Sequence, residues 1–221
     1  MVVRLACILA VAAAVLAGLA GGATAQAPAA ETRLERALAG IPQRGPWLGR
    51  PDAPVAIELF ADLQCPHCRQ FSQQTLPRLV REQVARGAVR LRYRFVTWLG
   101  RASVRMARLA VAAGDQGRLW QTTAQLLADQ GAEQSGDASD GYLREIAQRV
   151  RGLDADAAVA GARADASLDP LRAARRSARL LGVDGVPALA IGRRGGPLRR
   201  FDGDHTRLRE IAAAIEAARR G

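Results

Sequence analysis

Apolar positions divide the chain into predicted strands and helices. Residues 54–60 (PVAIELF) form a short apolar run with β-branched members, which is typical of a buried strand. Residues 89–95 alternate apolar side chains with arginine, and this period of two predicts a second strand with one face partly exposed to water. Between them, residues 66–86 predict a helix with a kink at Pro77 and an end at Gly87.

The next part of the chain, up to about residue 181, predicts several helices. Its apolar positions recur at helical spacing, in stretches separated by turns that contain glycine and aspartate. These stretches are residues 102–114, 116–130, 142–150 and 169–182. The polar stretch 131–141 predicts a flexible loop.

A hairpin and a helix are predicted at the C-terminal end. Pro187–Ile191 and Leu198–Phe201 flank a glycine-rich turn and predict two short antiparallel strands. Asp204–Arg220 has apolar side chains on one helical face and predicts a closing helix. The order is strand, helix, strand, several helices, strand, strand, helix.

The N-terminus has the pattern of an export signal. Arg4 precedes the apolar run Leu5–Ala20, and Ala25-Gln26-Ala27 has the A-x-A form of a cleavage site. We therefore expect residues 1–27 to be a signal peptide cleaved after Ala27, and the mature protein to be periplasmic. An uncleaved membrane anchor is the alternative, because the 19 residues 5–23 are uncharged and long enough to span a bilayer.

Residues 28–53 are expected to form an N-terminal extension before a domain at residues 54–221. Within the extension, residues 31–39 predict a short helix that ends at Gly40, and residues 40–54, rich in proline and glycine, predict loop and turn. With 221 residues and 49% apolar composition, the chain can bury the core of one domain with a sizeable insertion.

The net charge is strongly positive, and all 32 basic residues are arginine. Without residues 1–27 the chain keeps 31 arginines and 21 acidic residues, a formal charge of +10. Such a charge first suggests nucleic-acid binding. Because the arginines are scattered, aromatic residues make up only 4% of the chain and an exported protein seldom meets nucleic acid, we expect no nucleic-acid partner. The charge favours acidic partners or membrane surfaces instead.

The segment Cys65-Pro66-His67-Cys68 is the main candidate for chemistry. A zinc site needs about four ligands, but after Ala27 the chain has two cysteines and two histidines, and His67 lies inside the pair. Haem attachment needs a histidine directly after the second cysteine, where the chain has Arg69. We therefore expect no metal and no cofactor. A structural disulfide stays open as an alternative, although so short a loop gains little from a bridge.

Position in the predicted helix favours a redox role for the two cysteines. Cys65 lies at the helix N-terminus, where the dipole and unpaired N–H groups stabilise a thiolate. His67 and Arg69 add positive charge nearby. A thiolate that forms easily also leaves easily, which favours the reduced form and makes the disulfide an oxidant. Cys68, one turn further and more buried, would be the resolving thiol.

With these features, the sequence resembles the DsbA-like thiol:disulfide oxidoreductases of the thioredoxin superfamily. Three stretches carry the resemblance: APVAIELFADLQCPHCRQF at 53–71, GVDGVPALAIG at 182–192 and RRFDG at 199–203. It implies an α/β, thioredoxin-like fold with a helical insertion at about 98–181 between the βαβ and ββα halves. It also implies an enzyme that donates its disulfide to client proteins with cysteine thiols, and that a quinone-linked membrane protein reoxidises.

The resemblance also implies roles for single residues. Cys65 matches the attacking cysteine and Cys68 the resolving one. Pro187 matches the family's cis-proline, and Val186 the residue before it, which faces the disulfide and hydrogen-bonds the client's backbone.

The chain departs from the family at the buried acid beneath the disulfide. The family often has this acid six positions before the first cysteine, where this chain has Leu59. Glu58 is one step away and should point to the other face of the strand. Proton transfer would then depend on Glu58 after a bulge, on Asp62 or on water, or the relay would be missing.

Two other functions stay open. A periplasmic reductase or isomerase would often dimerise through a separate N-terminal domain, for which about 25 residues after Pro28 are too few; we expect a monomer. A chaperone would bind clients without exchange. Among the remaining residues, His205 is expected to start the last helix, and Trp98 and Trp120 to pack within the insertion.

Overall fold

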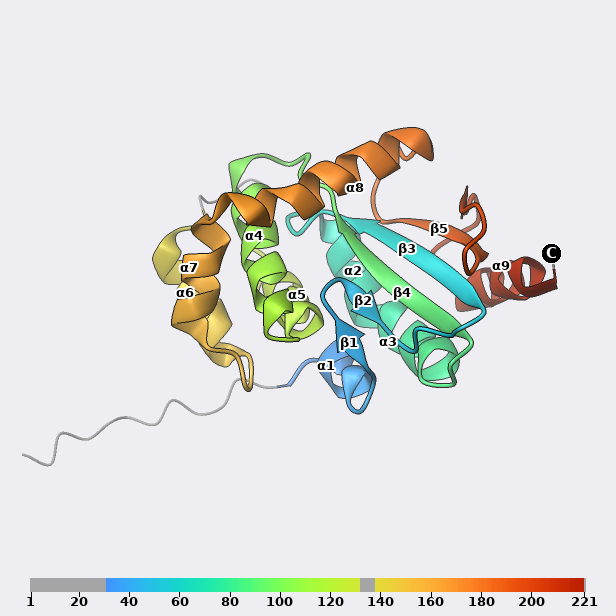
Figure 1. Ribbon diagram of the computed structural model, residues 1–221, viewed down its shortest axis with the longest axis horizontal. Coiled ribbons are helices and arrows are strands. Elements are labelled where there is room, and N and C mark those ends of the chain that lie inside the picture. The colour runs from blue at the N-terminus through green and yellow to red at the C-terminus, as the bar shows by residue number, and fades with distance from the viewer. Residues whose placement is uncertain (1–30, 132–137, 221) are drawn as a thin grey trace, which may run out of the picture.

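The computed structural model describes residues 31–131 and 138–220, which form a sheet with helices on both faces (Figure 1). The predicted signal peptide lies outside the described residues, as does most of the loop predicted at 131–141. No helix in the described part of the chain is long and apolar enough to cross a membrane.

The sheet has six strands in the order β1-β2-β4-β3-β5-β6. Their bounds are β1 Gln43–Arg44, β2 Trp47–Leu48, β3 Val55–Ala61, β4 Val89–Phe95, β5 Ala188–Arg193 and β6 Arg199–Arg200. The central strands β3 and β4 run parallel, and all other neighbours are antiparallel. Each outer strand, β1 and β6, is only two residues long. This arrangement confirms the predicted α/β, thioredoxin-like fold.

Nine α-helices surround the sheet in the described residues. Their bounds are α1 Arg33–Leu38, α2 Pro66–Gln74, α3 Leu76–Leu79, α4 Arg101–Asp115, α5 Leu119–Ala128, α6 Asp140–Arg149, α7 Ala155–Arg163, α8 Asp169–Leu180 and α9 Leu208–Arg220. Helices α4 to α8 lie between β4 and β5 in the chain and form the helical insertion.

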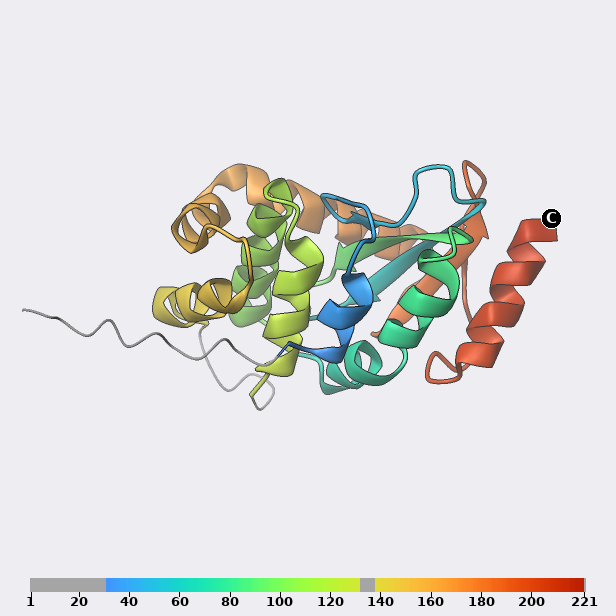
Figure 2. The same ribbon diagram turned by 90° about the horizontal axis from the view of Figure 1, so that it is seen from below.

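The two faces of the sheet have different cores. On one face, Ile57, Leu59 and Tyr93 pack with α2, α3 and α9. On the other face, Phe60 and Ala190 pack with α8 through Ala178. Figures 1 and 2 show α8 alone among the helices on this second face, which we call the α8 face.

Residues 40–54 are not all loop and turn, so that prediction was wrong in part. β1 and β2 form a hairpin there, and β2 continues the sheet by pairing with β4, with Trp47 opposite Arg92. Two-residue strands are too short to show a period of two, and Gly45 in the turn between them has φ +52°. The pairing partner, distant in sequence, determines these strands.

The helix predicted over 66–86 is present but interrupted. It is divided into α2, α3 and a π-helical turn at Val80–Val84. The break falls at Thr75, because Pro77 lies in the first turn of α3, where its missing N–H costs nothing. Gly87, with φ +74°, ends the segment as predicted.

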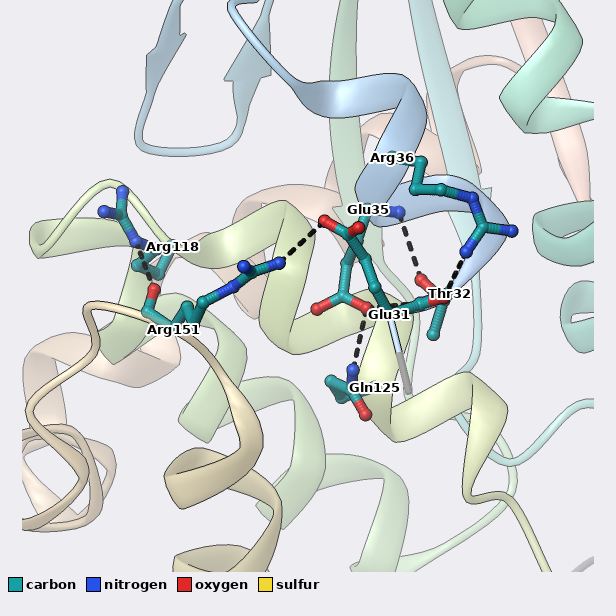
Figure 3. A network of polar contacts seen from close by, with 7 residues as sticks. All are labelled: Glu31, Thr32, Glu35, Arg36, Arg118, Gln125 and Arg151. Carbon is teal, nitrogen blue, oxygen red and sulfur yellow. Dashed lines mark hydrogen bonds and ion pairs between the residues drawn. The ribbon is translucent and has the colours of Figure 1, made fainter. Parts of the chain in front are cut away.

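Helix α1 is held against the insertion by polar contacts (Figure 3). Thr32 and Glu35 form a capping box at its N-terminus. Glu35 Oε2 also accepts a hydrogen bond of 2.7 Å from Gln125 in α5, and Glu31 forms an ion pair of 2.9 Å with Arg151. The residues before β3 therefore pack on the rest of the molecule.

Candidate functional site: a dithiol at the start of a helix

The two cysteines lie where β3 gives way to α2. Cys65 is the N-cap of α2 with extended backbone, and Pro66 occupies the first helical position. The Cys65 carbonyl accepts the N–H of Arg69, which fixes the first turn. Both sulfurs are free thiols, and Cys65 and Cys68 are 6% and 1% exposed.

The pKa values of the two thiols are shifted in opposite directions. The pKa of Cys65 is lowered to about 6, first by its hydrogen bond with Cys68, then by backbone contacts with Cys68 and His67 and by the charge of exposed His67, against the opposing effect of burial. Burial, and then Cys65, raise the pKa of Cys68 far above its ordinary value. Cys65 is thus a thiolate near neutral pH, and Cys68 a protonated thiol.

A cis-proline faces Cys65. The Val186–Pro187 peptide bond is cis, and Cys65 Sγ lies 3.5 Å from the Val186 carbonyl oxygen, to which the protonated form of Cys65 donates. Beside them is a hollow of about 370 Å³ lined by Val186, Pro187, Phe201 and His205. The hollow lies on the cis-proline side of the site, and its lining includes neither cysteine.

Asp62 lies directly before the active-site turn and is fully buried. Its Oδ1 accepts from Gln64 N at 2.9 Å and Ser103 Oγ at 2.6 Å, and its Oδ2 accepts from the N–H groups of Trp98 and Leu99 at 2.8 and 3.1 Å. The negative charge of Asp62 contributes to the raised pKa of Cys68. Asp62 therefore joins the dithiol loop to the start of the insertion.

Glu58 lies on the α8 face, away from the cysteines. The register of β3 on β4 is unbroken over the whole of both strands, so no bulge turns Glu58 inward. Its carboxylate pairs with Arg94, accepts from Ser177 Oγ at 2.9 Å and lies 3.6 Å from Arg92. The structure thus removes Glu58 as the expected relay, and Leu59 occupies the dithiol side of β3.

Two glutamines near the cysteines had not been expected. Gln130, buried after α5, donates from Nε2 to the carbonyls of Leu63 at 2.8 Å and Cys65 at 3.2 Å. Its own carbonyl accepts from Arg69 at 3.1 Å. Gln64 donates to Leu99 O and Ser103 Oγ. A single glutamine after a helix carries no sequence signal for such contacts; only the position of Gln64 beside Cys65 could have drawn attention.

The other aromatic and histidine predictions had mixed outcomes. Trp120 is fully buried and packs edge-on against Tyr93, as expected. Trp98 is 44% exposed, so the prediction that it packs within the insertion was wrong. Asp62 accepts a hydrogen bond from the backbone N–H of Trp98 and does not contact its ring through this bond. His205 precedes α9, which starts only at Leu208, and burial lowers its pKa.

Within residues 31–131 and 138–220, no group of three or more histidine, cysteine or acidic side chains is placed to hold a metal ion. A dithiol with divided pKa values, at a helix start and facing a cis-proline, defines a thiol:disulfide oxidoreductase on a thioredoxin-like sheet.

A family model described as Thioredoxin matches residues 42–216. The chain therefore belongs to the thioredoxin family, and it is similar to DsbA-like thiol:disulfide oxidoreductases.

Solved structures share the fold over most of the chain. BdbD from Bacillus subtilis has a TM-score of 0.69 and 19% identity, over 80% of this chain and 94% of its own. A thioredoxin-like oxidoreductase from Silicibacter pomeroyi has a TM-score of 0.63 and 28% identity, over 80% and 92%. DsbA2 from Pseudomonas aeruginosa has a TM-score of 0.65 and 24% identity, over 80% and 96%.

Curated relatives match over shorter segments. A probable disulfide bond formation protein D from Bacillus cereus is 38% identical over 68 residues, 31% of this chain and 30% of the relative. The thiol:disulfide interchange protein DsbG from Escherichia coli is 39% identical over 77 residues, 34% of this chain and 29% of its own. The matched segments thus span about 30% of these relatives.

Proposed function

We propose that this protein is an exported oxidase of client dithiols, and that Cys65 and Cys68 are its catalytic pair. The low pKa of Cys65 beside the cis-proline is the observation that carries this proposal. A site that favours the Cys65 thiolate favours the reduced protein, which makes the disulfide form a strong oxidant.

The exchange takes place in two displacements. A client thiolate attacks Cys65 Sγ, the Cys65–Cys68 bond breaks, and Cys68 leaves as a thiolate that takes up a proton. A second client thiolate then attacks the client sulfur of the mixed disulfide and releases Cys65 as a thiolate. The client loses two electrons and gains a disulfide, and the Cys65–Cys68 pair receives the electrons.

In this reaction, Val186 and Pro187 position the client. The hollow beside them would hold an extended client segment, whose backbone can hydrogen-bond to that of Val186. Pro66 occupies the first position of α2 and so keeps Cys65 at the helix N-terminus. His67 in the same turn adds positive charge near the Cys65 sulfur.

We propose that Asp62 acts as a fixed charge and that water carries the proton. Four hydrogen bonds occupy the two carboxylate oxygens, which leaves no lone pair directed at a proton. Burial and Cys65 raise the pKa of Cys68 and the Asp62 charge adds to this, so the Cys68 thiolate takes up a proton as it leaves. Asp62→Asn should increase the alkylation rate of Cys68 at pH 8 in a Cys65→Ser background. An unchanged rate, with Asp52→Asn as control, contradicts this role.

The remaining features of the proposal come from the family resemblance and the sequence. The oxidised state would be restored by a membrane protein that passes electrons to a quinone. The protein would act as a monomer in the periplasm after removal of residues 1–27, and it needs no metal or organic cofactor.

The equilibrium reduction potential of the dithiol against glutathione tests the proposed direction. A potential near about −120 mV is expected for a disulfide donor, and one near about −270 mV contradicts it and indicates a reductant. The more negative potential would favour the alternative function as a periplasmic reductase or isomerase. Loss of insulin-reducing activity in Cys65→Ser would exclude a function limited to client binding as a chaperone.

A further inference from the structure

The α8 face carries a row of arginines at the β1 side of the sheet. Arg90, Arg92 and Arg94 are alternate residues of β4 and point to the same face. Trp47 in β2 is opposite Arg92, and Arg44 in β1 is opposite Trp47, so both side chains share this face. We call the four arginines together with Trp47 the arginine row.

One carboxylate neutralises part of the arginine row. Glu58, opposite Arg92 in β3, pairs with Arg94 and lies 3.6 Å from Arg92. Among the described residues, Arg44 and Arg90 have no ion pair. Four guanidinium groups and one carboxylate leave a local excess of three positive charges.

Two of the four arginines stack on Trp47. The guanidinium carbon of Arg90 lies 4.0 Å from the centre of a Trp47 ring, and that of Arg92 lies 5.0 Å away. These are cation–π contacts, which fix the two side chains over the sheet. Arg90, Arg92 and Arg94 thus have contacts within the protein that position them before any ligand arrives.

Holding the arginine side chains close together is electrostatically unfavourable, and a bound anion would reduce the repulsion between them. Burial, and then Arg44, lower the pKa of Arg90; burial and Arg94 lower that of Arg92. Among the described residues, none is a hydrogen-bond partner of the buried Nε atoms of Arg90, Arg92 and Arg94. The groups have lost water and repel one another, which is unfavourable unless a carboxylate or similar anion pairs with them.

The arginine row is open to solvent at one end. In Figure 1, α8 crosses the carboxyl ends of β3 and β4, and no helix lies in front of β2 or the first half of β4. Arg44 is exposed, and Arg90 and Arg92 are half-buried. The two cysteines lie on the opposite face of the sheet.

We propose that the arginine row docks an extended acidic segment of a partner protein. Alternate side chains of an extended peptide repeat every 6.6 Å or so, which matches the spacing of alternate arginines along β4. Arginine also pairs with carboxylates through two parallel hydrogen bonds. A flat membrane surface fits less well, because α8 stands on the same face and would meet it first.

The proposal is tested with the full chain and a fluorescein-labelled peptide of alternating glutamate and threonine, followed by anisotropy at low salt. Binding is expected to weaken as salt rises, and to weaken about tenfold or more in Arg90→Gln/Arg92→Gln. The control Arg175→Gln/Arg176→Gln removes equal charge from α8 and should change binding less than about threefold. Oxidation of a dithiol peptide should stay unchanged in both variants.

Three outcomes overturn the proposal. One is absence of binding to the glutamate peptide, and another is equal loss in both double variants, which indicates attraction by net charge alone. The third is binding of phosphatidylglycerol vesicles with the same dependence on Arg90 and Arg92, which assigns the surface to a membrane. If Arg90→Gln/Arg92→Gln fails to fold, the exposed Arg44→Gln replaces it, with a loss of about threefold expected.

Discussion

Cys65 illustrates how a single residue acquires its chemistry from position. It is an ordinary cysteine in composition, but it lies at the N-cap of α2, within hydrogen-bond reach of Cys68 and near the charge of His67. The motif Cys-Pro-His-Cys and its place after a strand predicted the helix-start position and the nearby charge of His67, but not the hydrogen bond with Cys68. The contacts made by Gln130 depend on where the insertion returns to the sheet, which no local pattern encodes.

The acidity of Cys65 can be measured directly. In the reduced protein, thiolate absorbance near 240 nm should titrate with a midpoint near pH 6, and Cys65→Ser should remove this transition. Because folding lowers this pKa, ionisation of Cys65 stabilises the folded, reduced protein. This stabilisation is complete above the pKa of the unfolded state, about 8.5, and it is lost as the pH falls through 6. A midpoint above about pH 8 would contradict the assigned role of Cys65.

Gln130 should stabilise both the folded protein and the conformation of the dithiol loop. Gln130→Leu removes the side-chain donor of the Leu63 carbonyl, while the Cys65 carbonyl keeps the N–H of Arg69, and we expect a loss of about 1–3 kcal/mol in the free energy of unfolding. Denaturant titration measures this loss. Gln70→Leu, on the exposed side of α2, is the matched control and should change stability by less than about 0.5 kcal/mol.

At the scale of elements, the sequence predicted those whose pattern contains large apolar side chains. β3, β4, β5 and α4 show clear runs or periods, and the structure has them at nearly the expected residues. Helix α7 was not predicted, because it is buried through small residues such as Ala158 and Ala162, which give a weak periodic signal. Pairing with β4, rather than local sequence, produces β1 and β2.

The connection after β2 depends on a glycine. Gly49 has φ +98°, and a Cβ there would lie 2.7 Å from Val84 in the π-helical turn and 3.0 Å from the Val89 carbonyl. Gly49→Ala should therefore lower the unfolding free energy by about 1–3 kcal/mol through strain and overpacking. Thermal unfolding measures the effect. Gly45→Ala, which also has positive φ but no neighbour within 4 Å, should cost less.

At the scale of the whole molecule, the insertion and the sheet form one packed unit. Asp62, Gln64 and Gln130 connect the dithiol loop to the insertion, and Trp120 from α5 packs on Tyr93 of β4. A single hydrophobic core runs through both parts. Large-scale motion of the insertion against the sheet would break these contacts.

Unfolding should therefore be cooperative. We expect denaturant curves from tryptophan fluorescence, where Trp120 reports on the insertion, and from far-UV circular dichroism to coincide. Trp98→Phe removes the exposed indole and leaves the curves coincident. Two separated transitions would show that the insertion unfolds on its own.

The short edge strands of the sheet limit aggregation with other polypeptides, which matters for a protein proposed to oxidise client dithiols. Exposed strand edges recruit other strands, and a long free edge would let non-native polypeptides add to the sheet and seed aggregates. Here β1 and β6 are two residues long, and they carry Arg44 at one edge and Arg199 and Arg200 at the other. The edges of the sheet thus offer a polypeptide that approaches Cys65 almost no template for strand addition.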